Sequence, residues 1–149
     1  MKSTTFAMFA GLGLAILAPV AQAADADNAI KYRKNIMKIV GGSASAIAAV
    51  LKGEAGQQAD LAALTQMLAA STDPAITGAA FKQNTDDQGV EKTTAKGDIW
   101  SDWDKFAGIA VKLNDAAKVA AAAGENVSFA EMKPVFAECK ACHDDFRQK

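Results

Sequence analysis

Histidine, cysteine and proline are all scarce in this chain of 149 residues, and each shortage narrows what the protein can be. There is one histidine, and there are two cysteines and three prolines. One histidine and two cysteines are too few for a structural zinc site, which needs four ligands. A disulfide between two cysteines that are only three positions apart closes too small a loop to stabilise a fold. These residues are therefore expected to serve another chemistry.

Excess charge of one sign and long apolar runs are missing as well. The 16 basic and 17 acidic side chains give a formal net charge of −1, and no basic stripe stands out among them. A nucleic-acid partner is therefore not expected. The apolar run over residues 6–18 falls short of the roughly 20 residues that a membrane-spanning helix needs. No membrane span is expected in the mature chain.

The first 23 residues have the pattern of an export signal. Lys2 supplies the positive start, the apolar run follows, and Ala21-Gln22-Ala23 is a small-x-small cleavage site. We therefore expect a signal peptide over residues 1–23, which is removed, and one mature domain over residues 24–149. The expected location is an oxidising compartment such as the periplasm.

Helical periodicity occurs in four places, and no strand pattern persists. The fourth helix is expected to begin with the capping box Ser128-x-x-Glu131 and to be kinked at Pro134, or else to begin at that proline. The other helices are expected over residues 27–52, 57–71 and 98–123, with a long polar connection over residues 73–97. The pattern predicts an all-α fold, an antiparallel four-helix bundle with one long loop between its second and third helices.

The sequence Cys139-Lys140-Ala141-Cys142-His143 is the form of c-type haem attachment. Positions i, i+3 and i+4 share one helix face, so both thiols and the imidazole can meet one flat cofactor. A thioredoxin-like redox pair would follow a strand, and none is predicted here. Two buried cysteines beside a core histidine would leave the clustering of all three unexplained. We therefore expect one covalently attached haem c per chain, held by Cys139 and Cys142, with His143 as proximal iron ligand.

The sixth iron position cannot be filled by a second histidine, because the chain has only one. Met132 lies on the same helix as His143, and Met67 is expected to pack in the core. Met37 lies on the apolar stripe of the first helix, one turn after Arg33, an arginine that needs an acidic partner such as a haem propionate. Met37 is the expected distal ligand, and the alternative is that it fills space in the pocket.

At this point the sequence resembles the class II c-type cytochromes, the cytochrome c′ family. The similarity covers the segments "AIKYRKNIM", "AVLKGE", "DIWSDWDKF" and "CKACHDDFR". The resemblance implies that Arg33 approaches a propionate, that Met37 faces the distal side of the iron and that Arg147 lies beside the proximal face. It places Thr85 and Asp86 where the interhelical loop touches haem. The loop is longer here than in the family and has Phe81-Lys82 in place of Phe-Pro.

Two functional types exist within this family, and the resemblance leaves both open. A methionine-ligated, low-spin haem implies an outer-sphere electron carrier, and Met37 favours that type. The alternative is a five-coordinate, high-spin haem that binds nitric oxide or carbon monoxide. The expected function is thus a periplasmic monohaem electron carrier, not an enzyme, with redox proteins as partners. The first helix carries the small residues Ser43, Ser45 and Ala49, which would permit close packing against a second copy of the chain, so a homodimer is left open.

Overall fold

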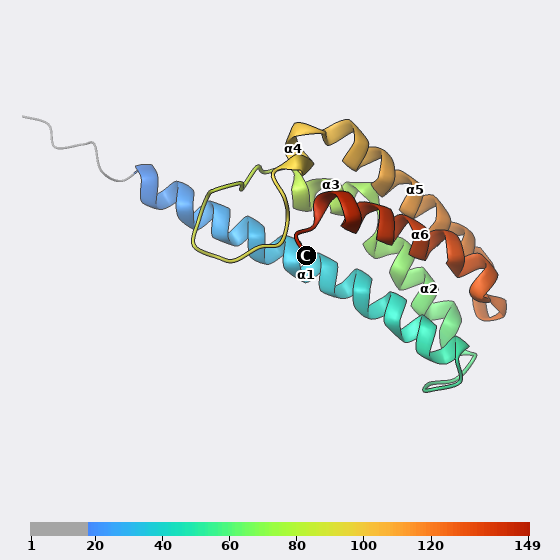
Figure 1. Ribbon diagram of the computed structural model, residues 1–149. Helices are drawn as coiled ribbons and strands as arrows, with labels where there is room; N and C mark the ends of the chain where they lie inside the picture. Colours follow the sequence, from blue (N-terminus) through green and yellow to red (C-terminus); the bar gives the residue numbers. More distant parts are fainter. Residues whose placement is uncertain (1–17) are drawn as a thin grey trace, which may run out of the picture.

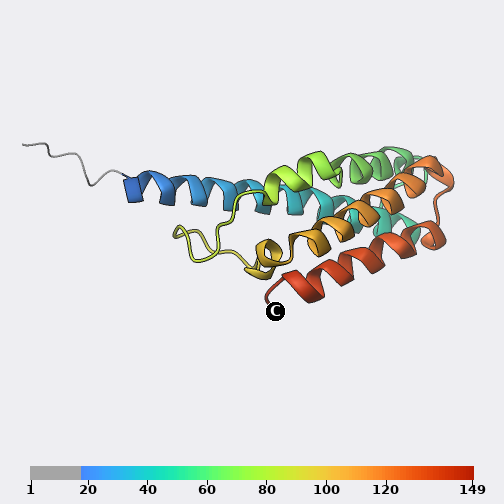
Figure 2. The same cartoon turned by 90° about the horizontal axis from the view of Figure 1, so that it is seen from above.

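The computed structural model describes residues 18–149, and these form an all-helical bundle (Figures 1 and 2). Most of the predicted signal peptide lies outside the described residues, and its last part, residues 18–23, belongs to the first helix. The helices are α1 (Ala18–Leu51), α2 (Asp60–Ser71), α3 (Pro74–Phe81), α4 (Asp98–Ser101), α5 (Trp103–Ala122), η1 (Gly124–Asn126) and α6 (Phe129–Phe146). Within residues 18–149 there is no strand, only one isolated bridge between Ala95 and Arg147.

Four long helices, α1, α2, α5 and α6, run alternately up and down the bundle, as Figure 2 shows. Helix α2 packs against α1 and α5, and α5 packs against α6. The prediction of an antiparallel four-helix bundle is confirmed. No helix in residues 18–149 combines the length and the apolar character that crossing a bilayer requires.

The helix ends follow local sequence signals where those are strong. Gly53 and Gly124 take positive φ angles of 71° and 59° and end α1 and α5. Ser128 caps α6 in a complete capping box with Glu131. The helix that follows includes Pro134 in its interior, so of the two alternatives the start at Pro134 is wrong.

Two other boundaries differ from the sequence-based expectation. The connection over residues 73–97 contains a helix, α3, which Asp73 caps by accepting a hydrogen bond from the backbone N–H of Ala75 at 2.8 Å. Pro74 at its first position is compatible with a helix start. The expected third helix is divided at Asp102, whose φ and ψ of −126° and 53° are not helical. The long loop is therefore shorter than predicted and runs from the end of α3 to α4.

The core between the helices contains an aromatic cluster at one end of the bundle. Phe106 of α5 lies at the centre, with ring centroids 4.8 Å from Phe81, 5.5 Å from Trp103 and 5.4 Å from Phe146. Such tilted and edge-on pairs stabilise beyond the apolar area they bury. The cluster fixes the ends of α3 and α6 relative to α5. Met132 is fully buried in the core, whereas Met67 is 51% exposed, which contradicts the core position expected for it.

Candidate functional site

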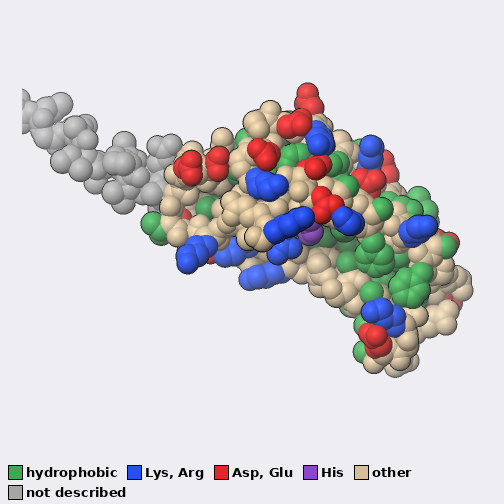
Figure 3. Space-filling model, viewed as in Figure 1, with side chains coloured by type: hydrophobic (Ala, Val, Ile, Leu, Met, Phe, Trp, Pro, Cys, Tyr) green, Lys and Arg blue, Asp and Glu red, His purple; other side chains and the backbone are tan. Residues whose placement is uncertain are grey.

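One face of α6 presents both cysteines and the histidine, as their spacing predicts. Cys139 and Cys142 are free thiols, half-buried against the core, and His143 is exposed on the molecular surface (Figure 3). Burial raises the pKa of Cys139, and raises that of Cys142 to about 11, with Cys139 and Asp145 adding to the shift. Both groups therefore stay protonated at neutral pH and are not reactive thiolates.

The imidazole of His143 is biased toward its neutral form. Partial burial lowers its pKa, the positive charge of Arg147 lowers it further, and Asp144 opposes the shift. A neutral imidazole has a free nitrogen lone pair, which is the form that coordinates a metal. Within residues 18–149 no cluster of three or more His, Cys, Asp or Glu side chains could hold a metal ion. A protein-only zinc site thus has no ligand set in this part of the chain.

The α6 face opens into a cavity of about 760 Å³ between α1, α5 and α6. That volume lies within the usual range for cofactor and ligand sites. The walls are mostly apolar. They comprise Val40, Gly41 and Ala44 of α1, Phe81 of α3, Phe106, Ile109 and Leu113 of α5, and Phe136 and Phe146 of α6, among others. Such a cavity excludes water from a bound apolar cofactor.

Arg33 is a buried cation at the edge of this cavity. It is 2% exposed, and its guanidinium lies 4.9 Å from the ring centroid of Phe81 and 5.0 Å from that of Trp100. Nε donates to the carbonyl of Ala80 at 3.3 Å, and Nη2 donates to Thr85 Oγ1 at 3.0 Å. Burial lowers its pKa. No carboxylate among the described residues pairs with it, so an anionic partner is needed.

The unsatisfied part of Arg33 is Nη1. This nitrogen is buried and has no hydrogen-bond partner among the described residues. Buried polar atoms without a partner are rare and call for an explanation such as a bound ligand. An apolar cavity with two thiols, an imidazole and one buried guanidinium fits a flat apolar cofactor that carries carboxylates, as haem does.

Met37 lines the cavity from α1, as expected for a distal residue. Its side chain is half-buried and packs against the core cluster. One turn further on, Gly41 lines the same wall, and a Cβ added there would meet no protein atom within 4 Å. The bare helix backbone therefore widens the cavity beside Met37. The structure brings Met37 and His143 to one cavity from helices far apart in the sequence.

Of the other residues predicted for the site, Arg147 lines the cavity, whereas Thr85 and Asp86 do not. Arg147 is exposed and lines the cavity next to His143. Thr85 is buried but lies behind the wall, where its hydroxyl accepts the hydrogen bond from Arg33. Asp86 is exposed, and neither it nor Thr85 lines the cavity. Haem contacts for these two residues stay a prediction.

The loop contributes to the cavity through residues that the sequence analysis missed. They are Lys92, Thr93, Thr94 and Ala95. No local signal marks them, because they reach the cavity only through contacts with α1 and with the segment after α6.

The family model for cytochrome C′ matches residues 28–147. The chain belongs to the cytochrome c′ family. The cytochrome c′ of Rhodopseudomonas palustris is 38% identical over 146 residues, which cover 92% of each chain. The solved cytochrome c′ from Rhodobacter Spheriodes has 30% identity and a TM-score of 0.71, covering 84% of this chain and 98% of its own. A variant of cytochrome c prime from Alcaligenes xylosoxidans, solved as its nitric oxide complex, has 28% identity and a TM-score of 0.70, with 83% and 96% covered.

Membership in the cytochrome c′ family identifies the cofactor as covalently attached haem c. The chain has two cysteines in all. Both line the cavity whose chemistry fits haem, so the cofactor expected from the sequence agrees with the family and with the site.

Proposed function

We propose that this cytochrome c′ is a periplasmic monohaem protein whose five-coordinate iron binds a diatomic gas, nitric oxide or carbon monoxide. The observation that carries the proposal is the family match, together with a related chain solved as a nitric oxide complex. It favours the gas-binding alternative over the electron carrier that Met37 suggested.

The residues that would hold the cofactor lie on two helices. Cys139 and Cys142 would form thioethers with the two vinyl groups, and His143 would supply the proximal ligand. Arg33 would direct its unpartnered Nη1 toward a propionate, which gives the buried cation its missing anion. When bound, haem supplies an iron with one position left for a gas on the side away from His143. Met37 would lie on that side and limit access by its bulk.

The His/Met electron carrier is the second candidate, and one observation favours it. Met37 lines the same cavity as His143, and a thioether in the sixth position would stabilise ferrous iron. Both candidates use the same attachment residues, so only the sixth position separates them.

Replacing Met37 with alanine tests which role this side chain has. In a five-coordinate protein the change removes bulk from the cavity wall, so carbon monoxide should associate with the ferrous form roughly tenfold faster, equivalent to about 1.4 kcal/mol off the barrier. The spin state without gas should stay high. Stopped-flow absorption measures both.

The control for this experiment is Met67→Ala, which removes the same side chain from an exposed position outside the cavity. It should leave the association rate unchanged. A wild-type spectrum that is low-spin and becomes high-spin in Met37→Ala would instead identify Met37 as an iron ligand and support the electron carrier.

A further inference from the structure

Residues 88–97, here called the strap, cross from α1 to the segment that follows α6 (Figure 1). Four of its residues, Lys92 to Ala95, line the cavity. The strap therefore forms part of the cavity wall, between its contacts with α1 and its contacts with the segment after α6.

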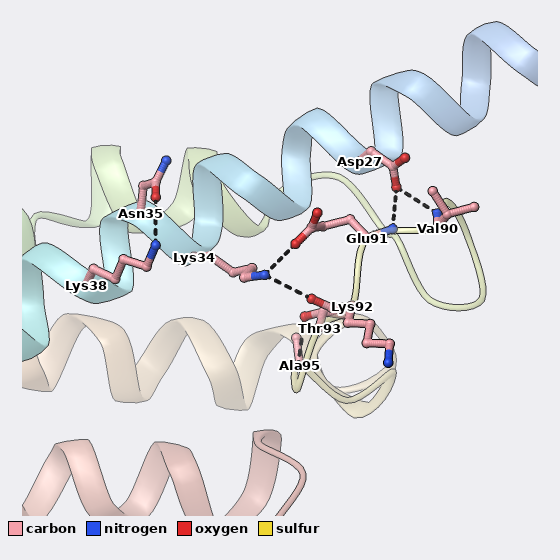
Figure 4. A network of polar contacts seen from close by, with 9 residues as sticks. All are labelled: Asp27, Lys34, Asn35, Lys38, Val90, Glu91, Lys92, Thr93 and Ala95. Atoms are coloured by element: carbon pink, nitrogen blue, oxygen red, sulfur yellow. Dashed lines mark hydrogen bonds and ion pairs between the residues drawn. The ribbon is translucent and has the colours of Figure 1, made fainter.

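On the α1 side, one carboxylate oxygen makes two hydrogen bonds to the strap. Oδ1 of Asp27 accepts hydrogen bonds from the backbone N–H groups of Val90 and Glu91, both at 2.8 Å (Figure 4). The hydrogen bond from Glu91 is the main cause of a lowered pKa for Asp27, and Lys31 adds to the shift. Asp27 therefore stays ionised at neutral pH, and hydrogen bonds to an ionised acceptor are the stronger kind.

A second contact joins the strap to α1 through Lys34. Its ammonium pairs with the carboxylate of Glu91 and donates to the carbonyl of Lys92 at 3.3 Å (Figure 4). The Lys34 side chain is 43% exposed, and ion pairs that exposed contribute little to stability. The charge of this pair is therefore a weak attachment, and Asp27 adds two hydrogen bonds to the strap backbone.

On the α6 side, backbone hydrogen bonds hold the strap in the manner of a short antiparallel pair. The N–H of Gln148 donates to the carbonyl of Thr94 at 2.7 Å, and the N–H of Lys96 donates to the carbonyl of Phe146 at 3.0 Å. These bonds do not depend on any side chain. Asp27 is therefore a side-chain attachment that a substitution can remove, as are Lys34 on the α1 side and Lys96, whose Nζ donates to the carbonyl of Asp145 at 2.8 Å.

The strap is shaped to meet Asp27 closely. Gly89 has a φ of +76°, which L side chains rarely adopt. A Cβ at this position would lie 2.3 Å from Asp27 Oδ1. Glycine is therefore required at residue 89 both for its backbone conformation and for the approach of the carboxylate. A substitution at Asp27 or at Gly89 should therefore break the contact between this carboxylate and the strap.

We infer that Asp27 is a positioning residue that holds the strap over the haem cavity and thereby slows the entry of small ligands. The effect on ligand entry, the entry part of the inference, rests on the proposed function, because it needs a gas that reaches the iron. The attachment of the strap by Asp27 does not rest on it. Local opening of a loop held by few contacts is the expected mode of access in such a structure.

The experiment compares Asp27→Ala, Gly89→Ala and the double variant in the haem-loaded protein. Deuterium uptake of the strap, measured by mass spectrometry, reports its opening, and flash photolysis reports carbon monoxide association. Both single variants should raise uptake and association several-fold. The double variant should raise uptake by less than the two single effects combined, since both changes break the same contact and only the backbone strain of Gly89→Ala is independent of Asp27. Asp27→Asn keeps an oxygen acceptor but loses the charge, so its uptake should fall between wild type and Asp27→Ala.

Two control variants separate the contact from general effects. Asp25→Ala removes an exposed carboxylate from the same helix, and Gly53→Ala imposes the same kind of strain at a φ of +71°, with no atom within 4 Å of the new Cβ. Neither should change uptake in the strap.

Unchanged uptake in Asp27→Ala, or an equal rise in Gly53→Ala, would overturn the inference. Faster uptake with unchanged gas association would overturn the entry part. If the wild type binds no carbon monoxide, the proposed function fails, and uptake alone then decides whether Asp27 holds the strap.

Discussion

Replacing Cys139 and Cys142 together with serine is expected to abolish covalent haem attachment. The two cysteines are the chain's only ones, and both line the cavity, so no other thiol can form a thioether. Without the cofactor the apolar cavity walls lose their packing partner, and the folded population should fall sharply. Intact mass and haem staining after denaturing electrophoresis measure the attachment.

The single variants Cys139→Ser and Cys142→Ser serve as the controls. Each leaves one thiol on the same helix face, so each should retain haem through a single bond with reduced yield. Haem that stays attached to the double variant after denaturation would show that the cofactor is held elsewhere, and would contradict the assignment of the site.

Replacing Arg33 with methionine is expected to destabilise the haem-loaded protein by about 2–4 kcal/mol. The change leaves the carbonyl of Ala80 and the hydroxyl of Thr85 without the donor they now have, and it removes the buried cation. Loss of a positive charge near the iron also favours the ferric state, so the reduction potential should fall. Denaturant unfolding and redox titration measure the two effects separately.

Thr85→Val is the control for Arg33. It removes one hydrogen-bond acceptor of the guanidinium but keeps the cation, so it should cost about 1 kcal/mol and leave the potential near wild type. If Arg33→Met lowers stability while the potential stays unchanged, the guanidinium has a structural role only, and its contact with a propionate is contradicted.

The parts of the site that could be predicted from the sequence depend on local geometry. Helix α6 begins at its capping box with Ser128, and its i, i+3, i+4 spacing alone brings Cys139, Cys142 and His143 to one face. Arg33 and Met37 could be assigned to the cavity because they lie on one apolar stripe of α1. In each case one helix determines where the side chain points.

The missed helix boundaries depend on tertiary contacts that outweigh weak local signals. Helix α3 occupies a segment whose polar neighbours suggested a loop, and its end is held by Phe81, which packs on Phe106. The division at Asp102 separates α4, which buries Ile99, from α5, which buries Phe106. A continuous periodicity does not reveal such a change of direction.

The loop was the least predictable part of the site, because its position depends on partners more than fifty residues away. Asp27 lies within α1, and its carboxylate accepts hydrogen bonds from Val90 and Glu91 of the loop. The family resemblance pointed to Thr85 and Asp86 in the loop, whereas the cavity wall is formed further along, by Lys92 to Ala95.

The absorption spectrum of the reduced wild-type protein, recorded with and without carbon monoxide, tests the central proposal most directly. A five-coordinate haem predicts a broad, high-spin Soret band that shifts when the gas is added. A low-spin spectrum with a methionine-to-iron charge-transfer band in the ferric form, and no response of the ferrous form to carbon monoxide, would contradict the gas-binding function and identify an electron carrier.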